Sequence, residues 1–140
     1  MKRGVFSAFA ALMLLSAFLL SGCSQNPKEF TIKVRCESAG IYQIFYTCYI
    51  DDESCGMGGM ADLNGGEITA DTDLTLTFTE SYLEGKDISK FAIDFSPYGK
   101  DDTSEIATTE KVYIGAEYGN TYTVVFSGDE DSGFTAQLQD

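Results

Sequence analysis

Residues 30–50 read FTIKVRCESAGIYQIFYTCYI, and this stretch decides the fold class. In its first part Phe30 and Ile32 begin a series in which every second side chain is apolar, with threonine, lysine and arginine between them. A period of two is that of a β-strand with one buried face. The second part repeats the period, so half-buried strands are predicted over residues 30–36 and 42–50.

The same alternation recurs along the rest of the chain. Five further runs have it, separated by clusters of glycine, aspartate and serine: residues 74–79, 91–96, 112–114, 121–126 and 134–139. Only residues 81–90 are left for a helical turn. Seven short strands at this spacing predict an all-β, antiparallel sandwich or barrel.

Residues 117–124, EYGNTYTV, sharpen this prediction. They resemble the approach to the penultimate strand in immunoglobulin-like and fibronectin-type domains, where a tyrosine begins the strand and its hydroxyl turns back to the preceding corner. The resemblance implies an antiparallel, seven-stranded, immunoglobulin-like β-sandwich. It extends to architecture alone, because the chain has no Trp and lacks the paired cysteines of antibody-type domains.

The segment Ser38-Ala39-Gly40 suits a three-residue hairpin loop with glycine in the left-handed position. In that register Cys36 faces Tyr42, and Phe30 faces Cys48. The two cysteines then lie roughly 20 Å apart, since a strand rises about 3.4 Å per residue. That separation exceeds the reach of a disulfide.

Cys48 and Cys55 can pair instead. The bridge would contribute roughly 2.5 kcal/mol by the loop-entropy estimate, and export would permit oxidation. A reducing habitat would leave both as thiols, and Cys36 is expected to be a buried thiol in either case. The alternative is a Cu(I) site that adds Met57 and Met60 as thioether ligands. It is disfavoured because the chain has no histidine.

The chain begins with a segment that has the layout of an export signal. Lys2 and Arg3 precede an uncharged apolar run over residues 5–20. The following residues Leu20-Ser21-Gly22-Cys23 resemble the lipobox of bacterial lipoproteins. The resemblance implies cleavage after Gly22 and a diacylglycerol on the Cys23 thiol.

This reading divides the chain into a signal peptide (1–22), a short tether with lipidated Cys23 (23–29) and a β-sandwich domain (30–140). The domain is then expected on the extracytoplasmic side of the cell membrane, held by its lipid. The alternative is an uncleaved membrane helix, but a run of sixteen falls short of the roughly 20 apolar residues that a span needs.

Charge and composition exclude several functions. Lys2 and Arg3 leave with the signal, so seven basic residues remain against 22 acidic ones, a net charge of −15. Nucleic acid is excluded as a partner, because its binding depends on cations that neutralise phosphates. The absence of histidine removes serine–histidine and cysteine–histidine catalysis, and no pair of carboxylates stands out for glycoside hydrolysis. We therefore predict no catalytic residues, no enzyme activity and no cofactor beyond the lipid.

The clusters of acidic residues fall in the segments between the predicted strands. Calcium takes six to eight oxygen ligands, which loops at one end of a sandwich can supply. Asp71, Asp73, Asp129 and Asp131 are the weak candidates, but no EF-hand spacing is present and solvated loop acids are the default.

A binding surface is predicted around residues 45–53. Phe45 and Tyr49 fall on the face of their strand opposite the core; they either pack under the edge of the second sheet, the favoured alternative, or form an exposed aromatic patch. Asp51, Asp52 and Glu53 follow on an acidic loop, and a flexible glycine run comes next.

The function predicted is a non-catalytic binding or structural role for a membrane-tethered lipoprotein that meets a protein or small ligand at the cell surface. One alternative is capture or inhibition of a basic protein such as a lysozyme by the acidic domain. A weaker one is a calcium-dependent adhesion or carbohydrate-binding module.

Overall fold

A computed structural model describes residues 27–140 of the chain. The predicted signal peptide and the Cys23 lipidation site lie outside the described residues. The described part is folded almost entirely from strands, joined by turns and one short 3-10 helix: β1 (Glu29–Cys36), β2 (Gln43–Ile50), β3 (Glu53–Ala61), β4 (Leu74–Thr79), η1 (Ile88–Lys90), β5 (Phe91–Tyr98), β6 (Val112–Tyr113), β7 (Thr121–Asp129) and β8 (Gly133–Gln139).

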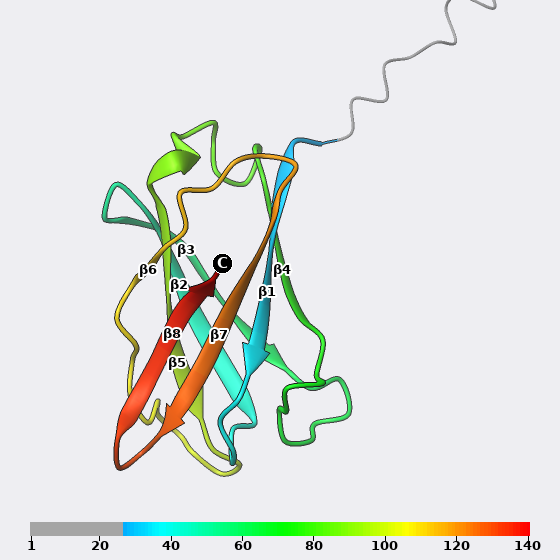
Figure 1. Ribbon diagram of the computed structural model, residues 1–140, viewed down its shortest axis with the longest axis vertical. Coiled ribbons are helices and arrows are strands. Elements are labelled where there is room, and N and C mark those ends of the chain that lie inside the picture. The colour runs from blue at the N-terminus through cyan, green and yellow to red at the C-terminus, as the bar shows by residue number, and fades with distance from the viewer. Residues whose placement is uncertain (1–26) are drawn as a thin grey trace, which may run out of the picture.

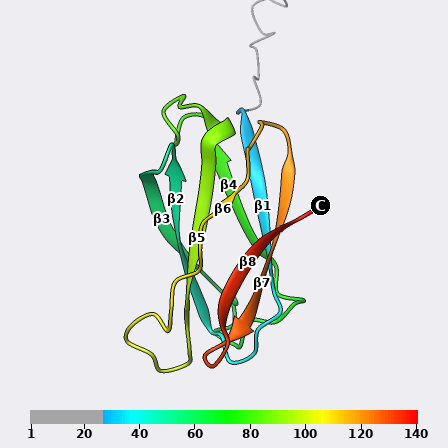
Figure 2. The ribbon, with the colours of Figure 1, turned by 60° about the vertical axis from the view of Figure 1, so that its left-hand side comes forward.

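The strands form two layers of four, which Figures 1 and 2 show from two directions. Sheet A has the order β4-β1-β7-β8, and sheet B has the order β3-β2-β5-β6. The predicted all-β class and the two-sheet sandwich are thus confirmed. All neighbours pair antiparallel except β1 and β7, which are parallel, so a purely antiparallel sandwich was wrong.

The predicted hairpin between the first two strands is also wrong, because β1 and β2 belong to different sheets. The segment between them crosses the end of the sandwich. The Glu37 N–H still bonds to a carbonyl of β7, whereas the Tyr42 N–H bonds to the carbonyl of Tyr98 in β5. Both strands bury one face in the same core, so their alternation alone could not tell a hairpin from a crossing.

The structure has the tyrosine contact that the resemblance implied, but not the immunoglobulin-type strand order. β7 is the penultimate strand, and the Tyr122 hydroxyl accepts a hydrogen bond of 2.8 Å from the Glu117 N–H, as the tyrosine corner requires. The strand order is different, because an immunoglobulin-type sandwich pairs its first two strands in one sheet. Here those strands lie in opposite layers.

The eighth strand is β3, which replaces the expected acidic loop and flexible glycine run. Asp51 and Asp52 both have positive φ (54° and 65°), the requirement of a two-residue type I′ hairpin turn between β2 and β3. The prediction failed because strand propensity counts glycine against a strand. Gly58 is required here: a Cβ on it would lie 2.5 Å from the hydroxyl oxygen of Tyr46, whose ring closes that side of the sandwich.

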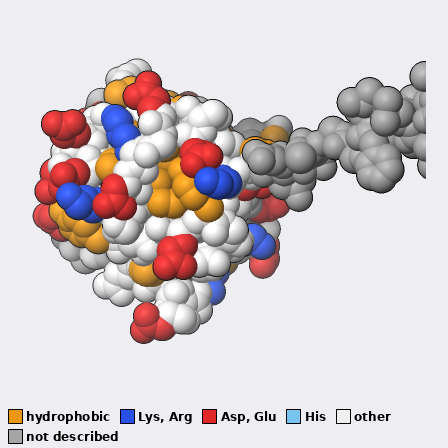
Figure 3. All heavy atoms as spheres, turned by 90° about the horizontal axis from the view of Figure 1, so that it is seen from above, with side chains coloured by type: hydrophobic (Ala, Val, Ile, Leu, Met, Phe, Trp, Pro, Cys, Tyr) orange, Lys and Arg blue, Asp and Glu red, His pale blue; other side chains and the backbone are white. Residues whose placement is uncertain are grey.

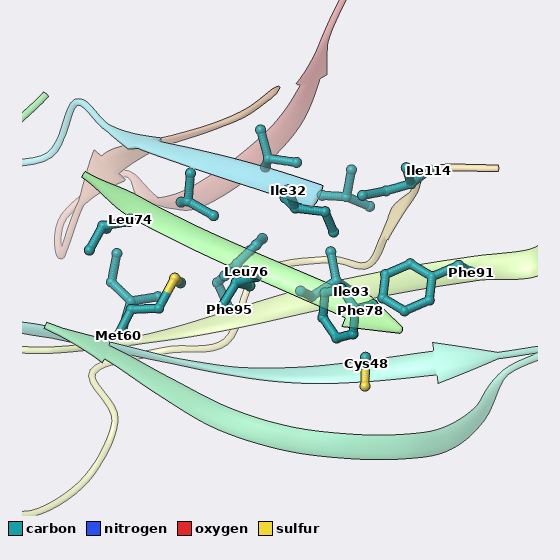
Figure 4. Packing of buried hydrophobic residues seen from close by; sticks show 14 of the residues in the cluster. Ile32, Cys48, Met60, Leu74, Leu76, Phe78, Phe91, Ile93, Phe95 and Ile114 are labelled. Carbon is teal, nitrogen blue, oxygen red and sulfur yellow. The ribbon is translucent and has the colours of Figure 1, made fainter. Parts of the chain in front are cut away.

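Aromatic side chains dominate the core between the layers. Phe30 of β1 lies 5.3 Å from Phe78 of β4 and 5.0 Å from Phe91 of β5, measured between ring centroids. Figure 4 shows Phe78, Phe91 and Ile32 converging from different strands in this core. The core joins both sheets, so each sheet has one buried side and one outer side. Among residues 27–140 there is no helix long and apolar enough to cross a membrane.

Candidate binding surface

The outer side of sheet B carries aromatic and apolar side chains where a sheet facing water is normally polar. Its members come from four strands, and we call them the aromatic face: Phe45, Tyr49, Met57, Tyr98 and Tyr113. Met57 is 76% exposed, Tyr113 63% and Phe45 44%. The structure therefore places Phe45 in an exposed patch and not under the edge of the second sheet.

Strand register brings these residues together. Residues paired across a sheet point to the same side, and Met57 is paired with Thr47 between Phe45 and Tyr49 on β2. The Phe45 ring packs against that of Tyr98, with centroids 5.0 Å apart. Tyr49 and Tyr113 both pair with Ala92 of β5, one from each side. The small alanine lies buried between the two tyrosines, at 1% exposure.

A hydrogen-bonded network fixes one end of the aromatic face. The Tyr49 hydroxyl donates to a carboxylate oxygen of Asp94 at 2.7 Å, and Asp94 is only 8% exposed. That bond raises the pKa of the Tyr49 hydroxyl above its ordinary value. The Lys111 ammonium lies 4.0 Å above the Tyr49 ring and pairs with Asp52 at 3.0 Å, while the Tyr113 hydroxyl donates to the same carboxylate.

The predicted acidic residues therefore occupy a hairpin turn rather than a loop. Asp52 is tied to Lys111, and Asp51 forms an ion pair with Lys90 at 3.0 Å. The ammonium and the tyrosine hydroxyl hold the pKa of the Asp52 carboxyl below its usual range. Glu53 begins β3 and remains exposed. Two lysines from other segments therefore pair with the two aspartates of the turn. Glu53 is left without an ion pair among the described residues.

Sequence reasoning found two members of the aromatic face and missed three. Phe45 and Tyr49 were identified from the alternation of β2. Met57 was missed because β3 was not recognised as a strand. Tyr98 was missed because the predicted fourth run, residues 91–96, stopped at residue 96 and Pro97 follows it. The alternation itself could have found Tyr113, which lies between the buried residues Val112 and Ile114.

A hollow borders the aromatic face at the edge of the sheet. It has a volume of about 250 Å³ and is lined by Gln43, Phe45, Gly59, Met60 and Ala61. Gly59 has no side chain to fill the space beside the Phe45 ring. The exposed ring and the hollow together can receive an apolar side chain of a ligand.

The structure brings Cys48 and Cys55 together as thiols, with sulfurs 3.2 Å apart. That distance is longer than a disulfide bond, so the bridge remains a prediction. A bulge in β3 leaves Cys55 out of the pairing, since Gly56 faces Cys48 and Ser54 faces Tyr49. Burial, followed by the neighbouring thiol, raises the pKa of Cys48 to about 12.

The expected Cu(I) alternative does not fit the geometry. Met57 points to the outer side of sheet B, whereas Met60 is buried in the core. The four sulfur ligands therefore do not converge. Cys36, as predicted, is a buried thiol, and burial raises its pKa.

The calcium candidates lie at the end of the sandwich opposite residue 27. Asp73 accepts a hydrogen bond from Thr75, and Asp129 accepts two from Ser132, which lower its pKa. In the part of the chain that is described, no three acidic or cysteine side chains gather as a metal-ion site. Asp129 and Asp131 instead border a hollow of about 320 Å³ with an apolar side formed by Ile41, Ile106 and Phe134.

Comparison with known proteins gives no relative from which a role could be transferred. No family model, curated protein or solved structure matches the chain.

Proposed function

We propose that the chain is a membrane-tethered, extracytoplasmic lipoprotein whose sandwich domain binds a partner without catalysis, through the aromatic face. The observation that supports this is the contrast in exposure. Met57 and Tyr113 stay largely in water, and Phe45 partly so, on a sheet whose inner side already supplies the core. Exposed apolar side chains that are gathered on one face mark interaction surfaces in soluble domains.

The aromatic residues are suited to such a role. Aromatic residues and methionine are enriched at the centres of protein interfaces, and aromatic side chains offer large contact areas at little cost in conformational entropy. The network of Tyr49, Asp94 and Lys111 holds part of the face in one conformation before any partner arrives. A preorganised surface loses less entropy on binding.

The tether would present this face sideways. β1 starts at the end where residue 27 enters, and the long axis of the strands leads away from that end (Figure 1). If Cys23 carries the lipid, the membrane lies at this end and the aromatic face stands roughly upright beside it. A partner that is itself at the membrane could then reach the face from the side.

Photo-crosslinking in intact cells tests the proposal. A benzoylphenylalanine placed at Met57 or Tyr113 should capture a discrete adduct. The matched positions Thr77 and Thr123, on the outer side of sheet A, should capture none. Equal adducts from both faces, or none from any position, would refute binding through the aromatic face.

The tether has its own test. Replacing Cys23 by alanine should release the protein from membranes, because the thiol would no longer receive its lipid. A Ser21→Ala variant keeps the cysteine and should stay with the membrane fraction. If Cys23→Ala still sediments with membranes, the lipoprotein assignment is wrong.

A second candidate function rests on the opposite end of the domain. Figure 3 looks onto the end where residue 27 enters, and there basic and acidic side chains are interspersed around apolar patches. The far end is different: the hollow beside Asp129, Glu130 and Asp131 combines three acids with an apolar side. Such a site suits an apolar-basic segment of a cationic protein such as a lysozyme.

Salt separates the two candidates. Capture driven by charge should weaken steeply between low and high ionic strength, since screening shortens the range of exposed charges to about 8 Å at 0.15 M salt. Binding to the aromatic face should change little. Replacing Asp129 and Asp131 by asparagine should abolish capture at the acidic end and leave adducts at Met57 unchanged.

A further inference from the structure

β3 forms one edge of sheet B and pairs only with β2. Its backbone makes no other backbone hydrogen bond within residues 27–140. From Met57 to Ala61 the N–H and C=O groups that point away from β2 therefore have no backbone partner among the described residues, whereas the Gly56 carbonyl accepts a hydrogen bond from the Cys48 thiol and Tyr82 packs against Gly56. An edge of this kind is a template for one more strand.

The usual protection of an exposed edge is scarce along β3. Natural sheets guard their edges with proline, lysine, short strands or bulges. β3 contains no proline and no lysine, and Glu53 is its one charged residue. Its bulge lies near the start, between the partners of Cys48 and Tyr49, and the stretch from Gly56 to Ala61 pairs regularly. The other edge of the same sheet, β6, is only two residues long.

Two glycines of β3 lie against aromatic rings of β2 near this edge. Gly58 lies under the Tyr46 ring on the inner side, and Gly59 lies beside the Phe45 ring on the outer side. The hollow of about 250 Å³ is at this point, bordered by Phe45, Gly59 and Ala61. A strand laid along the edge could place one apolar side chain in it.

Charge defines the chemistry of the occupant. Glu53 stands at one end of β3, and Asp62 follows its other end. Neither forms an ion pair with any lysine or arginine of the described residues, and one oxygen of Asp62 accepts hydrogen bonds from the Asn64 and Gly66 N–H groups. Seven cations stand against 22 acids in the described part. A second copy of the chain would bring the same negative charge to the edge and is disfavoured.

We infer that β3 receives an extended segment of a partner protein as an additional strand of sheet B. The segment alternates apolar and polar residues and carries a lysine or arginine near each end, about nine residues apart. This inference rests on the proposed function, because the added strand would extend the aromatic face. Main-chain hydrogen bonds would supply affinity, while the hollow and the terminal acids would supply selectivity.

A designed peptide tests the edge directly. The probe is Lys-Val-Thr-Val-Thr-Val-Thr-Val-Lys, acetylated and amidated, titrated into the isotope-labelled domain with amide NMR as the readout. We expect slowed hydrogen exchange at β3 amides and shifts that are largest from Gly56 to Ala61. A fully N-methylated peptide keeps every side chain and both charges but has no backbone donor. It should bind at least about ten-fold more weakly.

Two variants separate binding at the β3 edge from a general effect of added charge. Met57→Lys places a charge on β3 and should weaken binding of the probe. Thr123→Lys, on the outer side of sheet A, adds the same charge away from β3 and should leave the affinity of the probe unchanged. A probe with glutamate in place of both lysines should bind more weakly than the lysine probe.

Three results would overturn the inference: equal affinity of the N-methylated peptide, equal weakening by Thr123→Lys and Met57→Lys, or no shift in β3 amides at millimolar probe. The proposed function fails separately, through the absence of adducts at Met57 and Tyr113 in cells. Adducts at those positions without edge binding would remove the added strand and leave the aromatic face as the binding surface.

Discussion

The outer faces of the two sheets share one pleat and one core but carry different side chains. On sheet A, the residues that point outward are polar, most often threonine, with Lys33 and Arg35 among them and Val125 as an apolar exception. On sheet B, the residues of the aromatic face share the outer side with polar residues such as Gln43, Thr47 and Ser96. Threonine suits a strand that faces water, so folding alone explains the outer side of sheet A.

The difference shows that burial alone does not account for sheet B. Twenty-four hydrophobic residues of the described part are already buried, drawn from both sheets and from the segments between their strands. The aromatic face adds apolar surface where it contributes least to the fold. It also contains a nearly buried carboxylate, Asp94, which is costly unless it is hydrogen-bonded. Folding does not require the exposed side chains of the aromatic face or the nearly buried Asp94, and a binding role would account for them.

The largest difference between the sheets is expected at high pH. In sheet B the pKa of the Cys48 thiol is raised from 9.0 to about 12. The unfolded chain releases this proton near pH 9 and the folded chain keeps it, so stability is full below pH 9 and falls as the pH rises toward 12. Urea unfolding of the reduced protein at pH 7 and pH 11 measures this. Cys48→Ala should make the dependence less steep and leave the part that comes from the raised pKa values of Cys36 and Tyr49, and an unchanged dependence would contradict the assignment.

The edge strands give the next effect. Gly58→Val should lower the free energy of unfolding by about 2–3 kcal/mol, because the new side chain collides with the Tyr46 ring. Thr77→Val on β4, the edge of sheet A on the same side, should change it by less than about 0.5 kcal/mol. Chemical denaturation of both variants makes the comparison. Equal effects would show that β3 does not require glycine at this position.

Removing one hydroxyl from the aromatic face tests its network. Tyr49→Phe leaves the Asp94 carboxylate without its donor and should cost about 1–2 kcal/mol of unfolding free energy. Thr123→Val removes a hydroxyl from the outer side of sheet A and serves as the control, with little change expected. A loss that is the same for both variants would mean that Asp94 is satisfied by water.

The smallest effect concerns the exposed lysines. Lys111→Met removes a cation that lies over the Tyr49 ring and pairs with Asp52. Its melting temperature should fall slightly at low salt and match the original protein at high salt, because exposed pairs are screened. Lys33→Met on sheet A has no ion pair to lose among the described residues and should show no salt dependence. Identical behaviour of the two variants would remove Lys111 from the network.

Local patterns in the sequence predicted most strands and one motif. The alternation from Phe30 to Cys36 and from Leu74 to Thr79 matches β1 and β4 within a residue. The corner formed by Tyr122 depends on a few neighbouring residues, so it too was predictable. Strand partners were not, because every inward face shows the same alternation and nothing local selects which strand lies beside it.

The candidate site was predictable only in part, for the same reason. Phe45 and Tyr49 lie on one strand, and their common side follows from the period of two. Lys111 reaches Asp52 across 59 residues of sequence, and that contact exists only once β6 has joined β5. Glycine concealed β3, since its role there depends on the Tyr46 ring that packs against it.

Hydroxyl-radical footprinting of intact cells, compared with the purified domain, tests the central claim most directly. Methionine and aromatic side chains report well, and Met57, Phe45 and Tyr113 are exposed in the isolated domain. A partner on the aromatic face should reduce their oxidation several-fold in cells, while the exposed controls Leu63 and Leu138 keep their rates. Equal oxidation of all five residues in cells and in solution would contradict the account.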